Sequence, residues 1–255
     1  MKSRMMKQLR SYFDSVGISA NNFRCCNYEE CKAGNPNFVE ATEPYIGIEY
    51  EKNTLPRVLF LSLDPGSADS DPNNRTTKAS RKWMANFNPL SLRKGQHWYE
   101  THELAWKILR KFLPDLQFRK VGPYFAHTNC AKCCENNPNN SMASNRLFEN
   151  CRQFIPREIE ILSPDILVTQ GNSAKWVVEY EIYENEQDCY NSAEQLETGV
   201  DCCKVYIIII GDKKVVWIHT YHPRHGRYWN QKRDCFEGWT DAVYEYLTYH
   251  GRGND

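Results

Sequence analysis

RVLFLSLDPGSADSD, residues 57–71, is the stretch that decides the fold of this chain. Its first half is a continuous apolar run, of the length and composition of a strand buried on both faces. The Asp-Pro-Gly that follows is a tight-turn sequence, and it leaves the carboxylate of Asp64 at the carboxyl end of the strand. Ligands of open α/β sheets bind in the crevice beyond such ends. We therefore expect Asp64 to line a binding site.

Two further apolar runs end in polar side chains in the same manner. YFAHTNC, residues 124–130, delivers Asn129, and VVWIHTYHP, residues 215–223, delivers His222. An Asp, an Asn and a His, each at the tip of its own strand, form a candidate catalytic constellation. Each has a plain alternative: Asp64 as the first residue of a turn, Asn129 as a loop cap, His222 as a structural residue before proline.

Strand-like and helix-like segments alternate along the 255 residues, which favours a three-layer α/β/α sandwich with a central, mainly parallel sheet. We expect one domain, 1–255, with an N-terminal helix and Cys-rich loop (1–54) and an acidic insertion (179–201). Pro156 is expected to kink or divide a long helix. The expected elements are helices over about 2–15, 99–113, 145–162 and 233–249, strands at 57–63, 124–130 and 165–171, and a hairpin turning at 211–213.

The 32 basic and 32 acidic residues cancel, so the information lies in their distribution. Residues 75–94 carry six Lys or Arg and no acid, and residues 219–233 carry four with three His and no acid. Both basic stretches follow strand-end motifs and would attract a polyanion to the crevice, unless they are ordinary solvated loops. Residues 179–201 hold eight carboxylates and no basic residue, and either recruit a partner or solvate a face.

The 11 cysteines are most informative when the compartment is considered first. No segment approaches the ~18 apolar residues of a membrane helix, and MKSRMMKQLR lacks the apolar core of a signal peptide. We expect a cytoplasmic, monomeric protein without a membrane partner, in which cysteines serve as metal ligands rather than disulfides. Two groups stand out: 25, 26 and 31 in the first loop, and 130, 133, 134 and 151 later in the chain.

Thiolates suit an iron–sulfur cluster or zinc, and four ligands are needed. Cys26, Cys31, Cys133 and Cys151 make a sensible set, although Cys25 competes with the first and Cys134 with the third. The alternative is that all of them are small buried hydrophobic residues.

The motifs in this order resemble the uracil-DNA glycosylase superfamily, most closely its iron–sulfur branch, family 4. The residues that carry the resemblance are Ser62-Leu63-Asp64-Pro65-Gly66, Thr128-Asn129-Cys130-Ala131-Lys132-Cys133, Asn145-Arg146, Cys151, the run SPDILVTQGNSA at 163–174 and Thr220-Tyr221-His222-Pro223. The resemblance implies the α/β/α fold, glycosylase activity on DNA and a structural 4Fe-4S cluster, with zinc as the alternative. Two departures stand out: Ser62-Leu63 replaces the family's Gly-Glu, and its Pro-Phe-Val-Gly segment is absent.

Each of the three strand-end residues has an expected role in the cleavage of an N-glycosidic bond. Asp64 would orient water and stabilise the oxocarbenium ion, and His222 would donate a hydrogen bond to O2 of the departing base. Asn129 would read the Watson–Crick edge of a flipped pyrimidine, and Trp98 would stack on it, with Phe87 and Tyr99 as competitors. Arg224 and Arg227 would contact phosphates, while His225 or Tyr228 filled the vacated place in the duplex.

We therefore expect a monofunctional glycosylase that removes uracil or a related pyrimidine and leaves an abasic site, since the motifs place no lysine as a nucleophile. One alternative is an antiphage defence enzyme that removes a bulky hypermodified cytosine from phage DNA, because the aromatic and basic segment before residue 99 would reshape the pocket. Another is a catalytically inactive nucleic-acid-binding module on the same fold.

Overall fold

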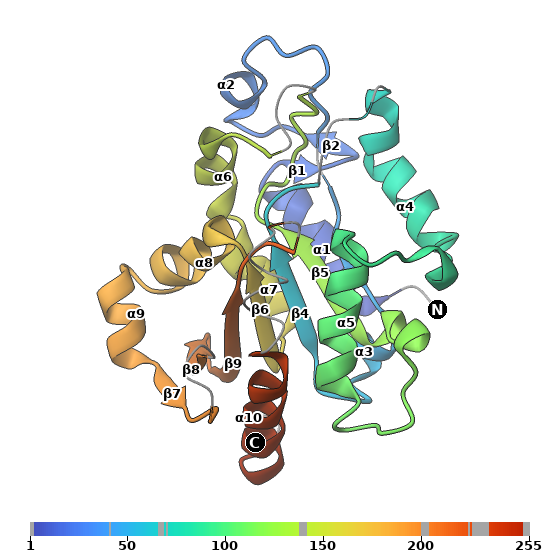
Figure 1. Cartoon of the computed structure of the whole chain (residues 1–255). Coiled ribbons are helices and arrows are strands. Elements are labelled where there is room, and N and C mark those ends of the chain that lie inside the picture. The colour runs from blue at the N-terminus through green and yellow to red at the C-terminus, as the bar shows by residue number, and fades with distance from the viewer. Residues whose placement is uncertain are drawn as a thin grey trace.

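A seven-stranded sheet forms the centre of the computed structural model, which describes residues 3–40, 42–65, 69, 71–137, 142–199, 204–223, 225 and 235–251 (Figure 1). The strand order is β3-β5-β4-β6-β9-β8-β7. The four inner strands β5, β4, β6 and β9 are parallel, while β3, β8 and β7 pair antiparallel at the two edges. The strands are β3 (Tyr45–Ile46), β4 (Val58–Ser62), β5 (Phe125–Asn129), β6 (Ile166–Gln170), β7 (Glu194–Leu196), β8 (Val205–Ile210) and β9 (Lys213–Thr220).

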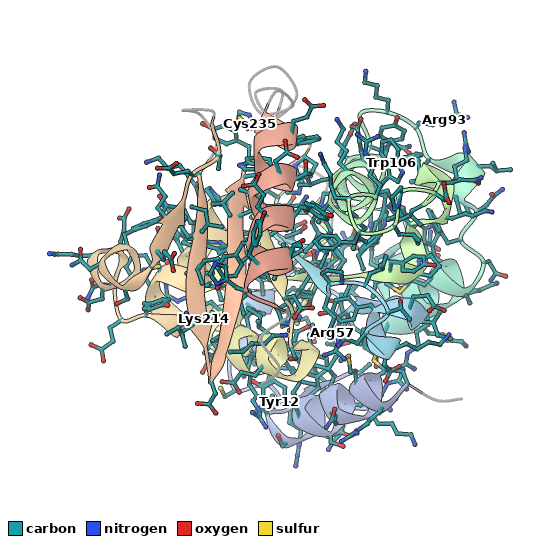
Figure 2. All side chains as sticks on the ribbon, turned by 90° about the horizontal axis from the view of Figure 1, so that it is seen from below. Tyr12, Arg57, Arg93, Trp106, Lys214 and Cys235 are labelled. Atoms are coloured by element: carbon teal, nitrogen blue, oxygen red, sulfur yellow. The ribbon has the colours of Figure 1, made fainter. Side chains whose placement is uncertain are left out.

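Helices cover both faces of the sheet, so the predicted α/β/α sandwich is confirmed. One face packs against α1 (Arg4–Ser15), α6 (Asn145–Arg152), α7 (Ile155–Leu162) and α8 (Asn172–Val177). The other packs against α5 (His97–Leu109) and α10 (Cys235–Tyr249). Figure 2 shows the layers from below, with the strands between α1, marked by Tyr12, and the helices marked by Trp106 and Cys235. Among the described residues no helix is long and apolar enough to cross a membrane.

Strand β4 contributes apolar side chains to the cores on both faces of the sheet. Leu59 and Leu61 point into the core beneath α1 and α7, whereas Val58 and Phe60 point into the core beneath α5 and α10. Every residue of the strand is buried. A strand that is apolar at every position fits only the interior of a sheet with helices on both sides.

Several segments differ from the sequence-based expectation in detail. Pro156 divides the long helix in two and stands at the start of α7, where its missing N–H costs nothing. The polar segment before α5 contains a helix that the sequence did not indicate, α4 (Thr77–Ala85). The acidic stretch contributes a π-helical turn (Val178–Ile182), α9 (Glu186–Ser192) and the edge strand β7. The first 54 residues add β1 (Ile18–Ser19), β2 (Asn22–Phe23), α2 (Tyr28–Lys32) and α3 (Ile48–Lys52).

Because β5, β4, β6 and β9 are parallel, their carboxyl ends share one edge of the sheet. One glycine at this edge is required by the packing. Gly171, directly after β6, has φ +97°, and a Cβ there would come within 2.9 Å of the Leu63 side chain. A side chain at this position would displace the Leu63 side chain, and its backbone would be strained at this φ.

Candidate active site

Asp64 lies just past the end of β4 and is held by a backbone hydrogen bond. Its Oδ2 accepts from the N–H of Ala143 at 2.7 Å, and the side chain remains half-buried. The segment after Asp64 is fastened to the loop after β5, because Asn136 Oδ1 accepts from Asp69 N at 2.6 Å and its Nδ2 donates to Asp69 O at 3.1 Å. A small pocket beside the carboxylate is lined by Cys134, Glu135, Asn136, Asn137, Met142 and Ala143. The carboxylate is thus oriented at the mouth of a pocket.

Asn129 is the last residue of β5 and is the register partner of Ser62 on β4. The pairing continues beyond the strands, since Cys130 N donates to Ser62 O and Ala131 N to Leu63 O, both at 2.9 Å. Asn129 is half-exposed, and no hydrogen bond among the described residues uses its side-chain amide. Its donor and acceptor are therefore available next to the strand end that carries Asp64.

His222 follows the end of β9 and stacks on a second histidine, His97. The two ring centroids are 5.0 Å apart and the ring planes are inclined by 26°. His97 is the first residue of α5, and its Nε2 lies 3.1 Å from Ser62 Oγ at the end of β4. His97 therefore connects the end of β4 with the loop that carries His222.

The buried hydroxyl of Ser62 is the centre of this polar network. It donates to Gln170 Oε1 at 2.6 Å, and it also lies 2.9 Å from His127 Nε2. Since a hydroxyl has one proton, the Nε2 atoms of both His97 and His127 must donate to its oxygen. Burial, with a smaller contribution from the nearby His222, lowers the pKa of His127 to about 3. His127 is therefore a neutral donor beneath the site at any working pH.

The sequence motifs did not identify Ser62, His97, His127 or Gln170 as site residues. One signal was available for His97. A helix that follows a parallel strand begins at the carboxyl edge of the sheet, so the first turn of such a helix lies near the ligand crevice. His97 opens the helix that follows β4 and α4, and it is close to that edge for this reason.

Trp98, the proposed stacking aromatic, lies half-buried in a cluster of rings. Trp83 of α4 stacks on it with centroids 5.7 Å apart and planes inclined by 26°, and His127 lies 4.9 Å away. Phe87 also contacts Trp98, at 6.4 Å, whereas Tyr99 packs against Phe118, at 5.0 Å. The site therefore has an aromatic wall contributed by α4 and α5. Arg224, Arg227 and Tyr228 lie outside the described residues.

A buried ion pair stiffens β5 behind Asn129. Lys132 Nζ donates to Glu158 Oε2 at 2.7 Å and to Thr128 Oγ1 at 2.9 Å, and Thr128 in turn donates to Glu158 Oε1. The Lys132 and Glu158 side chains are 2% and 0% exposed. The pair fastens the loop after β5 to α7.

The two cysteine groups converge at the top of the molecule as drawn in Figure 1, where α2 packs against α6. Asn150 Nδ2 donates to Cys31 Sγ and the backbone N–H of Lys132 donates to Cys151 Sγ, both at 3.4 Å. Burial, with smaller contributions from the nearby thiols of Cys31 and Cys25, raises the pKa of the Cys151 thiol to about 11. Within the described part of the chain, no three His, Cys, Asp or Glu side chains lie close enough together to hold a metal ion.

The donor set nevertheless fits an iron–sulfur cluster. Amide hydrogen bonds to sulfur are the usual surroundings of cluster thiolates, and Cys31 and Cys151 both receive one. Cys133 belongs to the same core as these two residues, whereas Cys134 lines the pocket beside Asp64. Cys25 is half-buried and Cys26 is exposed.

The match of the chain to known proteins agrees with this geometry. The sequence profile of the Uracil DNA glycosylase superfamily matches residues 49–243. This chain belongs to the uracil-DNA glycosylase superfamily. The resemblance inferred from the motifs is thereby confirmed, and the matched range includes Asp64, Asn129 and His222.

A curated relative in the superfamily is the type-4 uracil-DNA glycosylase of Archaeoglobus fulgidus. It is 27% identical over 133 residues, which are 52% of this chain and 60% of that protein. The chain therefore aligns with less than two thirds of the relative's length. Cys26 and Cys31 lie before the part of the chain that the superfamily profile matches.

Proposed function

We propose that this chain is a monofunctional DNA glycosylase that hydrolyses the N-glycosidic bond of uracil or a related pyrimidine in DNA. The observation that carries the proposal is the common edge of the sheet. In a superfamily member, Asp64, Asn129 and His222 lie at or just past the carboxyl ends of three parallel strands. A carboxylate, an amide and an imidazole at one edge are the groups that hydrolysis of this bond requires.

Asp64 would stabilise the sugar cation and orient the water that attacks it. As the base departs, the sugar gains oxocarbenium character, which a nearby carboxylate stabilises, and the same carboxylate orients the attacking water. The hydrogen bond from Ala143 N fixes one carboxylate oxygen, which reduces the reorganisation needed when charge develops. The Asp64 carboxylate is thus preorganised for this role.

His222 has the task of stabilising the departing base. A hydrogen bond from its ring to O2 would become stronger as negative charge accumulates on the pyrimidine. The stacked ring of His97 restricts the orientation of His222, and His97 is in turn anchored by Ser62. The unengaged amide of Asn129 supplies one donor and one acceptor for the Watson–Crick edge, and Trp98 supplies the aromatic surface for stacking.

The absence of strand cleavage is proposed on chemical grounds. Lys132 is the lysine nearest to Asn129 in sequence, and its ammonium group is buried and bonded to Glu158 and Thr128. An ammonium ion held in this way is a poor nucleophile for a Schiff base. The product would therefore be an abasic site in an intact strand.

Cys31, Cys133 and Cys151, with Cys25 or Cys26, would hold a 4Fe-4S cluster, and zinc is the alternative. Such a group would supply a structural cross-link between the first loop and the loop after β5, and no step of the hydrolysis needs electron transfer. Cys133 directly precedes Cys134, which lines the pocket of Asp64, so the cross-link would hold the loop that forms this pocket. Arg224 and Arg227 are proposed to contact phosphates.

A modified pyrimidine, such as the hypermodified cytosine of phage DNA, is the second candidate substrate. Gln170 is fully buried at the end of β6, and its Nε2 has no hydrogen-bond partner among the described residues. A buried donor without a partner is costly, and a substrate group that accepted its hydrogen bond would remove that cost. Both candidate substrates would undergo the same hydrolysis of the N-glycosidic bond.

The test is abasic-site formation by the purified protein on uracil-containing DNA and on phage DNA with hypermodified cytosines. Alkali after the reaction should cleave the strand at the abasic site, while omission of alkali should leave it intact. Product on either substrate supports a glycosylase and identifies the base. DNA binding without product on both would favour an inactive nucleic-acid-binding module.

A further inference from the structure

A continuous row of aromatic rings runs from the strand edge to the surface of α4. Its contacts are His222 on His97 at 5.0 Å, His97 on Trp98 at 6.2 Å, and Trp98 on Trp83 at 5.7 Å. The row ends at Trp83, which is 46% exposed and also contacts Phe87 at 5.0 Å. The row thus begins at the proposed active site and ends in a solvent-exposed indole.

The helix that carries the exposed indole also carries exposed cationic side chains. Lys78 and Lys82 are exposed and lie one turn apart on α4, and neither forms an ion pair with a described carboxylate. Arg81, between them in sequence, differs because it pairs with Glu43. Arg93, in the segment that leads back to α5, lies at the outer edge of the molecule in Figure 2. Two lysines on the same helix as Trp83 therefore remain available to an anionic partner.

An exposed tryptophan does not by itself bring cations that are free of ion pairs, as a second exposed tryptophan shows. Trp176 on α8 is 42% exposed, similar to Trp83. Its neighbour Lys175, however, forms ion pairs with Glu179 and Glu186 of the acidic stretch. The surface at Trp176 is thus unsuited to a polyanion, and among the residues that the structure describes only α4 combines an exposed indole with cations outside ion pairs.

We propose that α4 is a binding surface for an unpaired nucleobase that flanks the target nucleotide, with Trp83 as the stacking platform and Lys78 and Lys82 as phosphate contacts. An indole face and neighbouring cations are what proteins use to bind single-stranded nucleic acid without regard to sequence. Bases within a duplex have both faces covered by their neighbours, so the platform serves single-stranded or locally opened DNA. This inference rests on the proposed function, because it extends the same site along the DNA strand.

The test measures binding to a probe that contains no excisable base. The probe is a fluorescein-labelled oligothymidine strand, alone or annealed to oligoadenosine, and fluorescence anisotropy gives Kd for wild type and variants. Trp83→Ala should weaken single-strand binding roughly 5- to 150-fold and change duplex binding by less than about twofold. Trp176→Ala, the matched control, should change neither. Trp83→Phe should retain most of the single-strand affinity.

The two lysines give an independent readout. Lys78→Ala with Lys82→Ala should reduce the slope of log Kd against log salt by roughly 0.7 per residue for the single strand. Lys214→Ala, an exposed lysine near the amino end of β9, should leave the slope unchanged. These variants keep the Trp83–Trp98 stack, so they test the surface even if Trp83→Ala does not fold.

The inference is overturned if Trp83→Ala binds the single strand as wild type does, or if it loses single-strand and duplex binding equally. An unchanged salt slope in the lysine variants would also overturn it. Failure of the proposed glycosylase function has a different signature. A protein that binds the probe through Trp83 but releases no base from any DNA would support this surface and refute the enzyme.

Discussion

The rings of His97 and His222 stack with centroids 5.0 Å apart, although His97 is the first residue of α5 and His222 follows β9, more than a hundred residues later. His97 is also anchored at 3.1 Å to Ser62, on the strand that precedes Asp64. The contact therefore joins the two sides of the proposed site through one residue.

Replacement of His97 by Ala should lower the single-turnover rate of base release roughly 10- to 100-fold, because an unsupported His222 ring is misplaced in the transition state. The Kd for DNA should change by less than about twofold. The double variant with His222→Ala should be no slower than His222→Ala alone, since the two residues act through one group. His250→Gln, which replaces an exposed histidine stacked on Tyr246, serves as the control. Additive losses would contradict this coupling.

Much of this site could be predicted from the sequence, because strand-end residues are encoded locally. Asp64, Asn129 and His222 each follow an apolar run, and the runs became β4, β5 and β9. His97 could not be found in this way, because its partners come from strands far away in the chain. Whether it reaches Ser62 depends on how α5 packs, which no short motif encodes.

The same distinction explains the fold. Pro156 correctly predicted that the long helix would be divided, because proline breaks helices through local steric effects. Helix α4 was missed because it is polar and lies in a segment rich in turn residues, and its stability comes from packing such as that of Trp83 on Trp98. The two-residue strand β3 depends on pairing with β5 and has no signal of its own.

The buried ion pair of Lys132 and Glu158 predicts a large loss of stability. Replacement of Lys132 by Ala leaves a buried carboxylate without its partner and should lower the free energy of unfolding by about 3–5 kcal/mol. Arg157→Ala, which breaks an exposed pair with Glu160 on the same helix, should cost less than ~1 kcal/mol. Denaturant unfolding of both variants measures the difference. Similar losses in the two would refute the assigned role of the buried pair.

The proposed cluster predicts which cysteines are needed for the visible absorbance of the protein. Cys31→Ser and Cys151→Ser should each lower the iron content and the absorbance near ~400 nm that 4Fe-4S clusters show. Cys189→Ser replaces a buried thiol of the acidic stretch and should leave both unchanged. Separate Cys25→Ser and Cys26→Ser variants decide the remaining ligand. A colourless protein that contains zinc would favour the alternative metal, and full colour in the Cys151 variant would contradict the ligand set.

The neutral histidine beneath the site predicts a dependence of stability on pH. His127 has a pKa of about 3 in the folded protein, against about 6.5 in an unfolded chain. Between these values the unfolded chain binds the proton that the folded state excludes, so the free energy of unfolding falls as pH decreases. His127→Gln should lose part of this slope between about pH 7 and about pH 5, since His102, whose pKa burial lowers to about 4, keeps the rest. An identical slope in wild type and variant would contradict the prediction.

The measurement that tests the central proposal most directly is abasic-site formation on uracil-containing DNA and on DNA with hypermodified cytosines, by wild type and by Asp64→Asn. We expect wild type to release a base from one of the two, with the strand intact until alkali is added. Asp64→Asn should fold normally and react ~10²–10⁴-fold more slowly, because it loses the charge that traps the sugar cation. No abasic product from the wild-type protein on either DNA, or undiminished product from Asp64→Asn, would contradict the proposal.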